Sequence, residues 1–345
     1  MKTKMKTKRA SYFAAVVLTV AVVAFAPPAG AQQFSEWSTP VNLNMLPNQT
    51  TPINSASDDQ HMAISKDGLS LYFASNRAGG CGDFDIWVAQ RASVDSPWEE
   101  PFNLGCTINS SARDFAPNLS TDGHLLFFHS FRANDNCGGG DIYYTHRKNR
   151  RDDLGWEAPV NLNRVGRDPE ASLVCGVIAD LNYVNTPNTD AGPNYFQDEA
   201  DVTVLYFTRS DQPTTVGDFD IYRTTLASDG TWGMIVREDQ LSTVGFRDTR
   251  TAIRRRDGLE MILSSERPGG LGLVPRDLWV STRASTQNLW SIPVLLPNVN
   301  TTALEGAPAL SWDGTELYFF SARAGGAGGT DIYRSTRTKL IGPQP

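Results

Sequence analysis

Short apolar runs of four to seven residues recur along the chain and are separated by Gly, Asp, Pro and Ser. The first clear set, between residues 61 and 104, is HMAIS, LSLYFAS, DIWVAQR and PFNL. Runs of this length between turn-forming residues predict β-strands. Beyond residue 31, no long stretch has the periodicity of an amphipathic helix. The pattern therefore predicts an all-β fold built from units of four short strands.

Three markers repeat with these units. An Asp followed by Ile or Leu and then by an aromatic residue occurs at Asp85, Asp141, Asp220, Asp277 and Asp331. A Trp before an extended apolar pair occurs at Trp37, Trp98, Trp156, Trp232 and Trp290. Asp-Gly, which favours tight hairpin turns, begins at Asp67, Asp122, Asp257 and Asp313. Four-strand units repeated around an axis are β-propeller blades.

The count of markers predicts a five-bladed β-propeller. The first Trp precedes the first Asp marker and no Trp follows the last, so residues 34–44 should supply the outer strand of the last blade and close the ring. A sixth, degenerate blade inside residues 163–200 is the alternative. We expect a disordered tail at 341–345 and blades near residues 56–104, 111–162, 187–238, 245–296 and 302–338.

The repeat as a whole, S-x-D-G-x-x-L-Y-F-x-S-x-R-x-G-G followed by D-I-Y/W, resembles the WD40-like propeller repeats of the TolB family. The resemblance covers residues 35–338. It implies an exported propeller that binds proteins or small ligands. Such propellers also occur as domains of peptidases, but we expect no peptidase domain in this chain.

Residues 1–31 have the features of an export signal: a basic start, a 15-residue apolar run and Ala29-Gly30-Ala31 as a cleavage site. The run is short of the ~20 residues that span a bilayer, so we expect no membrane span and a periplasmic or secreted protein. The leader holds five of the 31 basic residues and none of the 38 acidic ones, which leaves a net charge of −12. This charge argues against nucleic acid as the partner.

Each blade also repeats an arginine before a glycine-rich turn and the Asp marker after it. Both flank the same turn, so they can face each other across a hairpin. We predict structural Arg–Asp pairs, because breaking one partner of a buried pair is costly. The members are Arg77 with Asp85, Arg132 with Asp141, Arg267 with Asp277, and Arg323 with Asp331.

The connections between blades carry a second repeat, Asn-Ser/Thr with an acid five residues after the Asn. The acids should open the innermost strands and ring the mouth of the channel; they are Asp59, Asp114, Asp190, Asp248 and Glu305. Three roles are open: hydrogen bonding to their own loops, binding of Ca²⁺ or another ligand, or catalysis by one pair. Asp83 and Asp218 could add oxygen ligands for Ca²⁺. No other cofactor is indicated.

Four cysteines in an exported chain predict two disulfides. Cys81 and Cys137 lie in glycine-rich turns, and Cys106 and Cys175 lie in the connections that follow them. We therefore expect Cys81–Cys106 and Cys137–Cys175, although composition alone allows three pairings. The insertion at 164–183 is a candidate binding loop or a cover for the channel.

Other signals for catalysis are weak. The four histidines lack metal-ligand spacing, and the chain has no nucleophile elbow, Cys-x2-Cys motif or phosphate loop. We assign no catalytic residue from the sequence. The basic run at 254–256 is interpreted as a solvated hairpin turn, with docking of an acidic partner as the alternative.

These observations favour a non-enzymatic, monomeric binding module for a protein, peptide or glycan, with activity as an enzyme left uncertain. One alternative is a glycan-directed hydrolase that uses acids at the channel mouth. The other is a Ca²⁺-dependent structural protein of the cell envelope.

Overall fold

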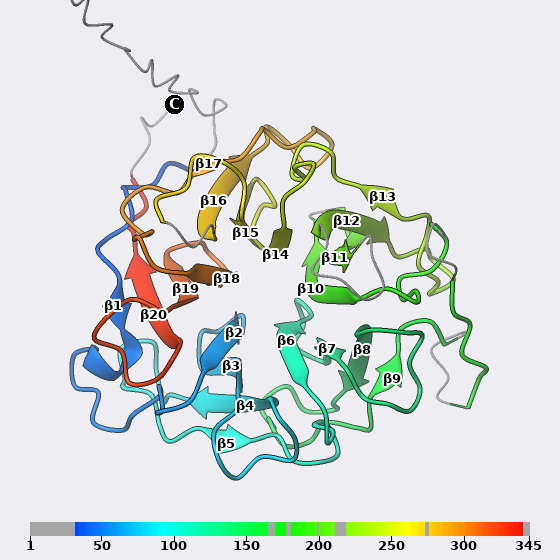
Figure 1. The fold of residues 1–345 in the computed structure, drawn as a ribbon, viewed down its shortest axis with the longest axis horizontal. Helices are drawn as coiled ribbons and strands as arrows, with labels where there is room; N and C mark the ends of the chain where they lie inside the picture. The colour runs from blue at the N-terminus through cyan, green and yellow to red at the C-terminus, as the bar shows by residue number, and fades with distance from the viewer. Residues whose placement is uncertain are drawn as a thin grey trace, which may run out of the picture. The chain divides into compact units, whose positions relative to one another are not determined.

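The computed structural model describes residues 32–164, 170–176, 181–198, 200–210, 219–272 and 276–340. Their fold is a five-bladed β-propeller, with five sheets of four antiparallel strands arranged in a ring (Figure 1). The fold class predicted from the repeats is confirmed. No α-helix occurs among these residues, which contain one short 3-10 helix, η1 (Leu43–Met45).

The strands follow one another outward in each blade. The first complete blade contains β2 (Asp59–Ile64), β3 (Ser70–Ser75), β4 (Asp85–Gln90) and β5 (Phe102–Asn103). The second contains β6 (Asp114–Leu119), β7 (Leu125–Ser130), β8 (Asp141–His146) and β9 (Val160–Asn161). The third contains β10 (Asp190–Gln197), β11 (Thr203–Ser210), β12 (Phe219–Thr225) and β13 (Val236–Arg237).

The last two blades repeat the order, with one difference in where the outer strand comes from. The fourth blade contains β14 (Asp248–Ile253), β15 (Glu260–Ser265), β16 (Asp277–Thr282) and β17 (Val294–Leu295). The fifth contains β18 (Glu305–Leu310), β19 (Glu316–Ser321) and β20 (Asp331–Thr336), and its outer strand is β1 (Val41–Asn42).

The ring is closed by strands from both ends of the described chain. β1 pairs with β20 through Val41 opposite Arg334 and Asn42 opposite Tyr333. The innermost strands β2, β6, β10, β14 and β18 neighbour one another around the axis, and β18 neighbours β2 (Figure 1). The described part of 163–200 contributes β10 to the third blade and no separate blade, so the alternative with six blades is wrong.

The core lies between the blades. Along β3, Leu71 and Phe73 pack in one cluster with the fifth blade, whereas Tyr72 packs with the second blade. Neighbouring side chains on a strand point to opposite faces. Because both faces of a blade are buried, the central strands read as continuous apolar runs and not as alternating ones.

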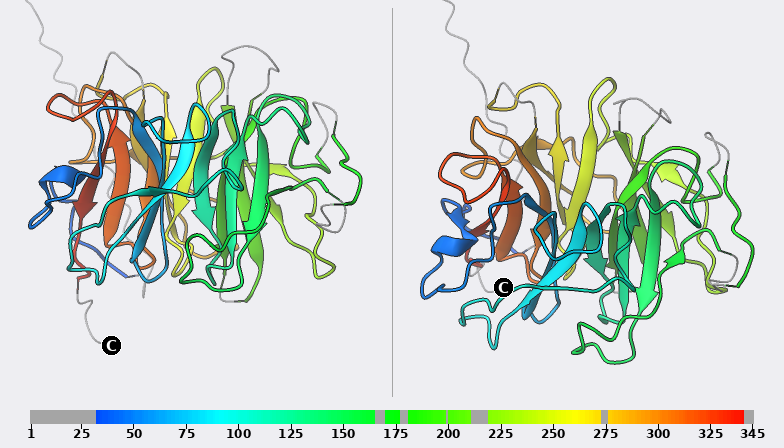
Figure 2. Two further views of the ribbon diagram at one scale, coloured as in Figure 1. Left: turned by 90° about the horizontal axis from the view of Figure 1, so that it is seen from below. Right: turned by 60° about the horizontal axis from the view of Figure 1, so that its bottom comes forward.

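Two faces carry the loops, and the strands run between them (Figure 2). The connection face holds the links between blades, such as 104–113, and the turns between second and third strands, such as 76–84. The hairpin face holds the Asp-Gly turns, such as 65–69. No helix in the described residues is long and apolar enough to cross a membrane.

An arginine that follows the third strand explains two of the sequence markers on the hairpin face. Arg91 stacks 4.4 Å from the Trp98 ring and donates its Nε–H to the carbonyl oxygen of Gly68, 2.7 Å away. The same arrangement joins Arg147, Trp156 and Gly123; Arg283, Trp290 and Gly258; and Arg337, Trp37 and Gly314. The Trp and Asp-Gly markers are thus parts of one structural unit that fixes the outer strand.

Candidate functional site

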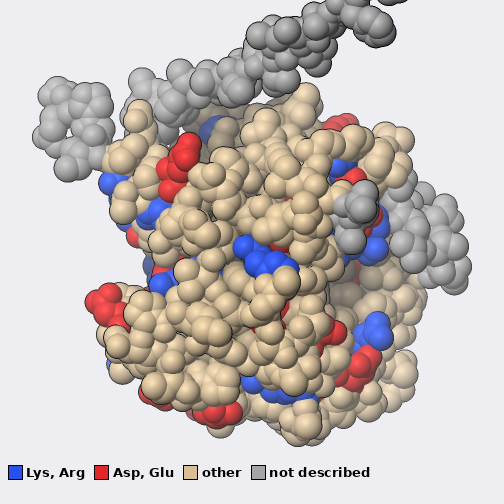
Figure 3. All heavy atoms as spheres, turned by 60° about the vertical axis from the view of Figure 1, so that its left-hand side comes forward, with Lys and Arg blue, Asp and Glu red and all other residues tan. Residues whose placement is uncertain are grey.

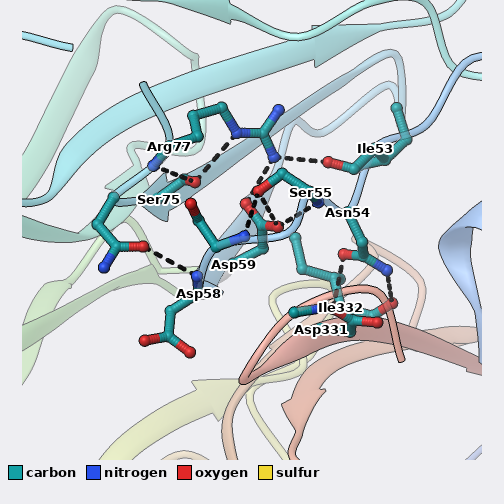
Figure 4. A network of polar contacts seen from close by, with 12 residues as sticks. Ile53, Asn54, Ser55, Asp58, Asp59, Ser75, Arg77, Asp331 and Ile332 are labelled. Atoms are coloured by element: carbon teal, nitrogen blue, oxygen red, sulfur yellow. Dashed lines mark hydrogen bonds and ion pairs between the residues drawn. The ribbon is translucent and has the colours of Figure 1, made fainter. Parts of the chain in front are cut away.

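The five repeated acids open the innermost strands, as expected. Asp59 accepts hydrogen bonds from the backbone N–H of Ser55 at 2.6 Å and from its hydroxyl at 3.0 Å (Figure 4). Arg77, at the end of the neighbouring strand, pairs with the other carboxylate oxygen at 2.5 Å. The carboxylate therefore fixes the connection that leads into its own strand.

The other four blades repeat this ion pair. The pairs are Arg132–Asp114 at 2.9 Å, Arg209–Asp190 at 2.7 Å, Arg267–Asp248 at 2.6 Å and Arg323–Glu305 at 3.1 Å. All five acids are fully buried. Hydrogen bonding to their own loops is the role that these contacts support, and none of the five carboxylates is exposed to a ligand.

The expected partners of the arginines differ from the observed ones. Arg77, Arg132, Arg267 and Arg323 pair with the acids of the innermost strands and not with the Asp marker of the third strand. The register does not decide between them, because both Asp59 and Asp85 lie opposite Ser75. The difference comes from the connection before Asp59, where Arg77 also donates to the carbonyl oxygen of Ile53 at 2.6 Å. The guanidinium reaches inward over Ser75, whose hydroxyl accepts its Nε–H at 3.0 Å.

The Asp markers instead cap the glycine-rich turns. Asp85 accepts a hydrogen bond from the backbone N–H of Gly82 at 3.1 Å and from the Asn103 amide at 2.8 Å. Equivalent bonds to the turn backbone are made by Asp141 from Cys137, Asp277 from Leu271 and Asp331 from Ala327. These four markers thus join a turn to its strand. In the third blade, Asp220 pairs with Arg237 at 2.7 Å.

The Asn of the connection repeat links neighbouring blades. Asn54 accepts a hydrogen bond from the backbone N–H of Ile332 at 2.8 Å and donates to its carbonyl oxygen at 3.0 Å (Figure 4). Asn109, Asn185 and Asn300 repeat this with the third strand of the preceding blade. In the connection that lacks the Asn, the Ser242 hydroxyl accepts the bond from Ile221. Most of the repeated polar residues therefore hold the ring together.

The described residues contain no group of three or more His, Cys, Asp or Glu side chains arranged to hold a metal ion. Asp83, a possible extra Ca²⁺ ligand, forms an exposed ion pair with Arg113 at 2.6 Å. Asp218 lies outside the described residues.

Both expected disulfides are present, Cys81–Cys106 and Cys137–Cys175, and they are compatible with export. The described part of the 164–183 insertion is held at the side of the ring. Arg164 pairs with Asp135 at 2.5 Å, and the Leu181 carbonyl oxygen accepts a hydrogen bond from Ile235 next to β13. None of its described residues lines the cavity that lies on the propeller axis.

A cavity of about 220 Å³ lies on the propeller axis near the connection face. Its walls come from the third residue of every innermost strand. In each case that residue has a positive φ at a β-bulge; the residues are His61, Ala116, Gly192, Arg250 and Ala307. A bulge re-aims a side chain away from the regular alternation of a strand. We call this cavity the axial pocket.

The axial pocket combines aromatic walls with basic groups. His61 lies 5.2 Å from the Phe115 ring and His129 lies 4.7 Å from the Phe131 ring, measured between centroids. Burial, reinforced by the positive charge of Arg250, holds the pKa of His61 well below its usual range and lowers that of His129 to about 3. Both imidazoles are therefore neutral at physiological pH.

The sequence pattern did not indicate this site. The histidines lacked a metal spacing, and Arg250 belongs to no repeated motif. A signal was present nonetheless, because each of these strand residues follows the repeated acid by two positions. In a regular strand, residues two positions apart point to the same side, so these residues would be expected beside the buried acid. The bulge turns them toward the axis instead.

Outside the pocket, charges are mixed. On the face shown in Figure 3, Lys and Arg side chains lie in small groups beside Asp and Glu, with no large area of one sign among the described atoms. The basic run at 254–256 is not a solvated turn, because Arg254 and Arg255 are buried. Arg254 pairs with Glu260 at 2.6 Å.

No protein-family model matches the chain, so the resemblance to TolB repeats finds no support there. No curated protein matches its sequence either.

Solved structures do match the fold. The α-L-arabinofuranosidase of Podospora anserina in complex with cellotriose has a TM-score of 0.51 at 12% identity, over 88% of this chain and 97% of that one. The α-L-arabinofuranosidase of Lactobacillus brevis has a TM-score of 0.51 at 15% identity, over 88% and 99%. The endo-arabinase of Bacteroides thetaiotaomicron has a TM-score of 0.50 at 17% identity, over 88% and 98%. At these identities, the likeness concerns the five-bladed propeller fold.

Proposed function

We propose that the chain is a glycan-directed hydrolase whose substrate enters the axial pocket from the connection face. The observation that carries the proposal is the pocket itself, which combines aromatic rings with basic groups at the axis of the propeller. A concave site with apolar walls and a few convergent polar groups is typical of a ligand pocket. A fold alone does not imply a function, so the site has to carry the argument.

The comparisons correct the first expectation of a non-enzymatic binding module. The matching propellers include arabinofuranosidases, a xylan β-1,4-xylosidase and an endo-arabinase, all of which are glycan-cleaving enzymes. They favour the alternative that was open from the sequence, a glycan hydrolase. The acids of the innermost strands are not its catalytic groups in our proposal, because all five are buried and ion-paired.

Glycoside hydrolysis commonly uses two carboxylates on either side of the scissile bond. The described lining of the axial pocket contains neither Asp nor Glu, but one carboxylate is paired with a lining residue and another precedes one in the sequence. Glu266 pairs with the lining residue Arg276 at 2.8 Å, and Asp58 precedes the lining residue His61 by three positions. Asp58 accepts a hydrogen bond from the Thr330 hydroxyl at 3.0 Å, and both acids are partly exposed. We assign Asp58 and Glu266 as candidate proton donor and acceptor.

The proposal is tested by incubating residues 32–345 with arabinan, xylan and pectin fragments and measuring released reducing ends. We expect turnover on at least one glycan, and a loss of roughly 100-fold or more in Asp58→Asn and Glu266→Gln. Glu157→Gln is the control, because that carboxylate is 53% exposed and outside the pocket lining. Absence of turnover on the whole panel by folded protein would overturn the proposal.

A second test blocks the pocket without touching an acid. Thr189 lines the pocket immediately before β10, and Thr189→Trp should fill much of the space and abolish turnover. Val244→Trp is the matched control, because Val244 is 85% exposed and does not line the pocket. Equal activity in both Trp variants would place the active site elsewhere.

We further propose that the mature protein begins near Gln32 and acts in the periplasm or outside the cell as a monomer. The basic and apolar start of the chain and the two disulfides support export. N-terminal sequencing of the exported protein and its elution volume in size-exclusion chromatography test these two points.

A further inference from the structure

The axial pocket is closed on the side of the hairpin face. Arg255 follows β14 and reaches across the axis, where it donates hydrogen bonds to the carbonyl oxygens of Ile64 at 2.7 Å and Leu119 at 3.1 Å. These two residues end the innermost strands of the first and second blades. Between Arg250 and Arg255 only about 10 Å³ of space remains. Among the described residues, the open side of the pocket is therefore the connection face, and the pocket accepts the end of a chain.

Arg250 lies in the wall of this blind pocket with its charge uncompensated. Its side chain is more than nine-tenths buried, and its Nε and Nη1 atoms have no hydrogen-bond partner. The repeated arginines described above, in contrast, each pair with a buried acid or stack on a Trp. A buried guanidinium without a counter-ion is costly, and burial lowers the pKa of Arg250 to about 9. An anion from a ligand would supply the missing partner.

Two further arginines line the same pocket. The Nε atoms of Arg247 and Arg276 are buried without a hydrogen-bond partner. Arg276 shares its charge with Glu266, whereas Arg247 lies 4.9 Å over the Phe219 ring and forms no ion pair with any described residue. The described lining thus holds more positive than negative charge. This excess favours an anionic ligand over a neutral one.

The remaining groups suit a sugar ring that carries such an anion. Neutral imidazoles can donate to and accept from hydroxyl groups, and Phe115, Phe131 and Phe320 give apolar walls to the faces of the ring. The volume of about 220 Å³ is below the ~300 Å³ at which pockets for drug-sized ligands begin, so it fits one small unit. A guanidinium presents two parallel N–H groups that match a carboxylate.

We propose that the axial pocket binds the terminal uronic-acid unit of an acidic glycan, with the carboxylate of that unit on Arg250. This deepens the proposed function, on which it rests for the link between binding and cleavage. It names the substrate class as carboxylated glycans, in place of the neutral arabinose and xylose polymers that the names of the matching enzymes indicate.

The test measures binding alone, by isothermal titration calorimetry of residues 32–345 with galacturonic acid, galactose and galactose 6-sulfate. We expect galacturonic acid to bind at least about tenfold more tightly than the other two, because hydrogen bonds to charged groups are the strong ones. Equal binding of galactose would overturn the anionic assignment. Tightest binding of the sulfated sugar would overturn the carboxylate assignment, and no binding of galacturonic acid would overturn both.

Arg250→Gln should reduce affinity for galacturonic acid at least about tenfold and leave that for galactose unchanged. Its thermal midpoint should stay equal or rise, because the variant removes an uncompensated buried charge; a folding defect would lower the midpoint instead. Arg247→Gln, in a less buried position, serves as the second variant and should weaken binding of the same acid. Unchanged affinity in both variants contradicts the proposal.

The outcome is separable from that of the hydrolase proposal. A protein that binds galacturonic acid through Arg250 but cleaves no glycan keeps this inference and loses the hydrolase. A protein that cleaves neutral glycans and binds galacturonic acid no better than galactose keeps the hydrolase and loses this inference.

Discussion

Buried arginines in this protein differ in whether an acid neutralises their charge, and Arg267 and Arg250 show the contrast. Arg267 is 7% exposed and pairs at 2.6 Å with the fully buried Asp248, whose pKa is raised by burial despite that partner. Arg250, two positions after Asp248 in β14, is buried without an acid that pairs with it. The first is a structural group and the second is available to a ligand.

Replacement of Arg267 by Leu should lower the free energy of unfolding by about 3–5 kcal/mol, because it leaves the Asp248 carboxylate buried and unpaired. Arg113→Gln is the control: its ion pair with Asp83 is about half exposed on both sides and should contribute less than about 1 kcal/mol. Urea unfolding of both variants measures the difference. Similar small losses would show that the buried pair contributes no more than a surface pair.

The Asp markers differ in how many of their carboxylate oxygens accept hydrogen bonds. Burial, followed by the nearby charges of Asp190 and Asp135, raises the pKa of Asp141 to about 7, and its Oδ1 atom has no hydrogen-bond partner. In Asp331 both oxygens accept hydrogen bonds, from Ala327 and Gly328. The two positions are equivalent in the repeat but not in their surroundings.

Stability should therefore depend on pH through Asp141. Its folded pKa lies above the unfolded value near 3.9, so the folded state holds the extra proton and stability decreases as pH rises from about 4 to 7. Asp141→Asn should remove that decrease, measured by urea unfolding at pH 5 and pH 7. Asp331→Asn is the matched control. If the stability of the wild-type protein falls no more than that of Asp141→Asn between pH 5 and pH 7, the assignment is contradicted.

At the scale of the elements, the repeats allowed the strands, the hairpin turns, the number of blades and the disulfides to be predicted. These features depend on local apolar pattern and on residues with strong turn preferences. The partners of the arginines could not be predicted, because Asp59 and Asp85 both lie opposite Ser75. The Arg77 guanidinium lies beside Asp59 because it also bonds to the connection at Ile53. The axial pocket was also missed, because it depends on a bulge that turns His61 and Arg250 toward the axis.

The two disulfides each restrain a turn and the connection that follows it, over separations of 25 and 38 residues. Replacing Cys137 and Cys175 by Ser should lower the free energy of unfolding by about 2–4 kcal/mol, since the unfolded chain gains loop entropy. The measurement is urea unfolding under non-reducing conditions, with the Cys81/Cys106 double Ser variant as the matched comparison. Unchanged stability in both would show that neither bridge restrains the unfolded chain.

For the molecule as a whole, the closure between the two ends of the described chain matters most. β1 pairs with β20, and the backbone N–H of Leu340 donates to the carbonyl oxygen of Gln33 at 2.8 Å. The ends of the domain are therefore adjacent, and the fifth blade is complete only when both are present. Such a ring should depend on closure and much less on where the chain starts.

A circular permutant tests this. Joining residue 340 to residue 32 with a short linker and opening the chain at the exposed Asp229-Gly230 turn should give a folded protein with an unchanged β-sheet circular dichroism spectrum. Opening the chain instead between Asn185 and Thr186, inside a bonded connection, should prevent stable folding. The opposite order of stability would show that the connections contribute less than the hairpin turns.

The bulges of the five innermost strands also have a consequence for how such a protein can diverge. Each bulge places one residue on the axis while the ion pair two positions earlier keeps the blade in place. The residues now at these sites range from Gly192 and Ala116 to Arg250. Substitutions there can change the shape and charge of the pocket while the repeated acid, arginine and asparagine are retained. Relatives with the same repeats could thus inherit one scaffold and differ in the ligand they select, and a library randomised at these five codons would explore that range.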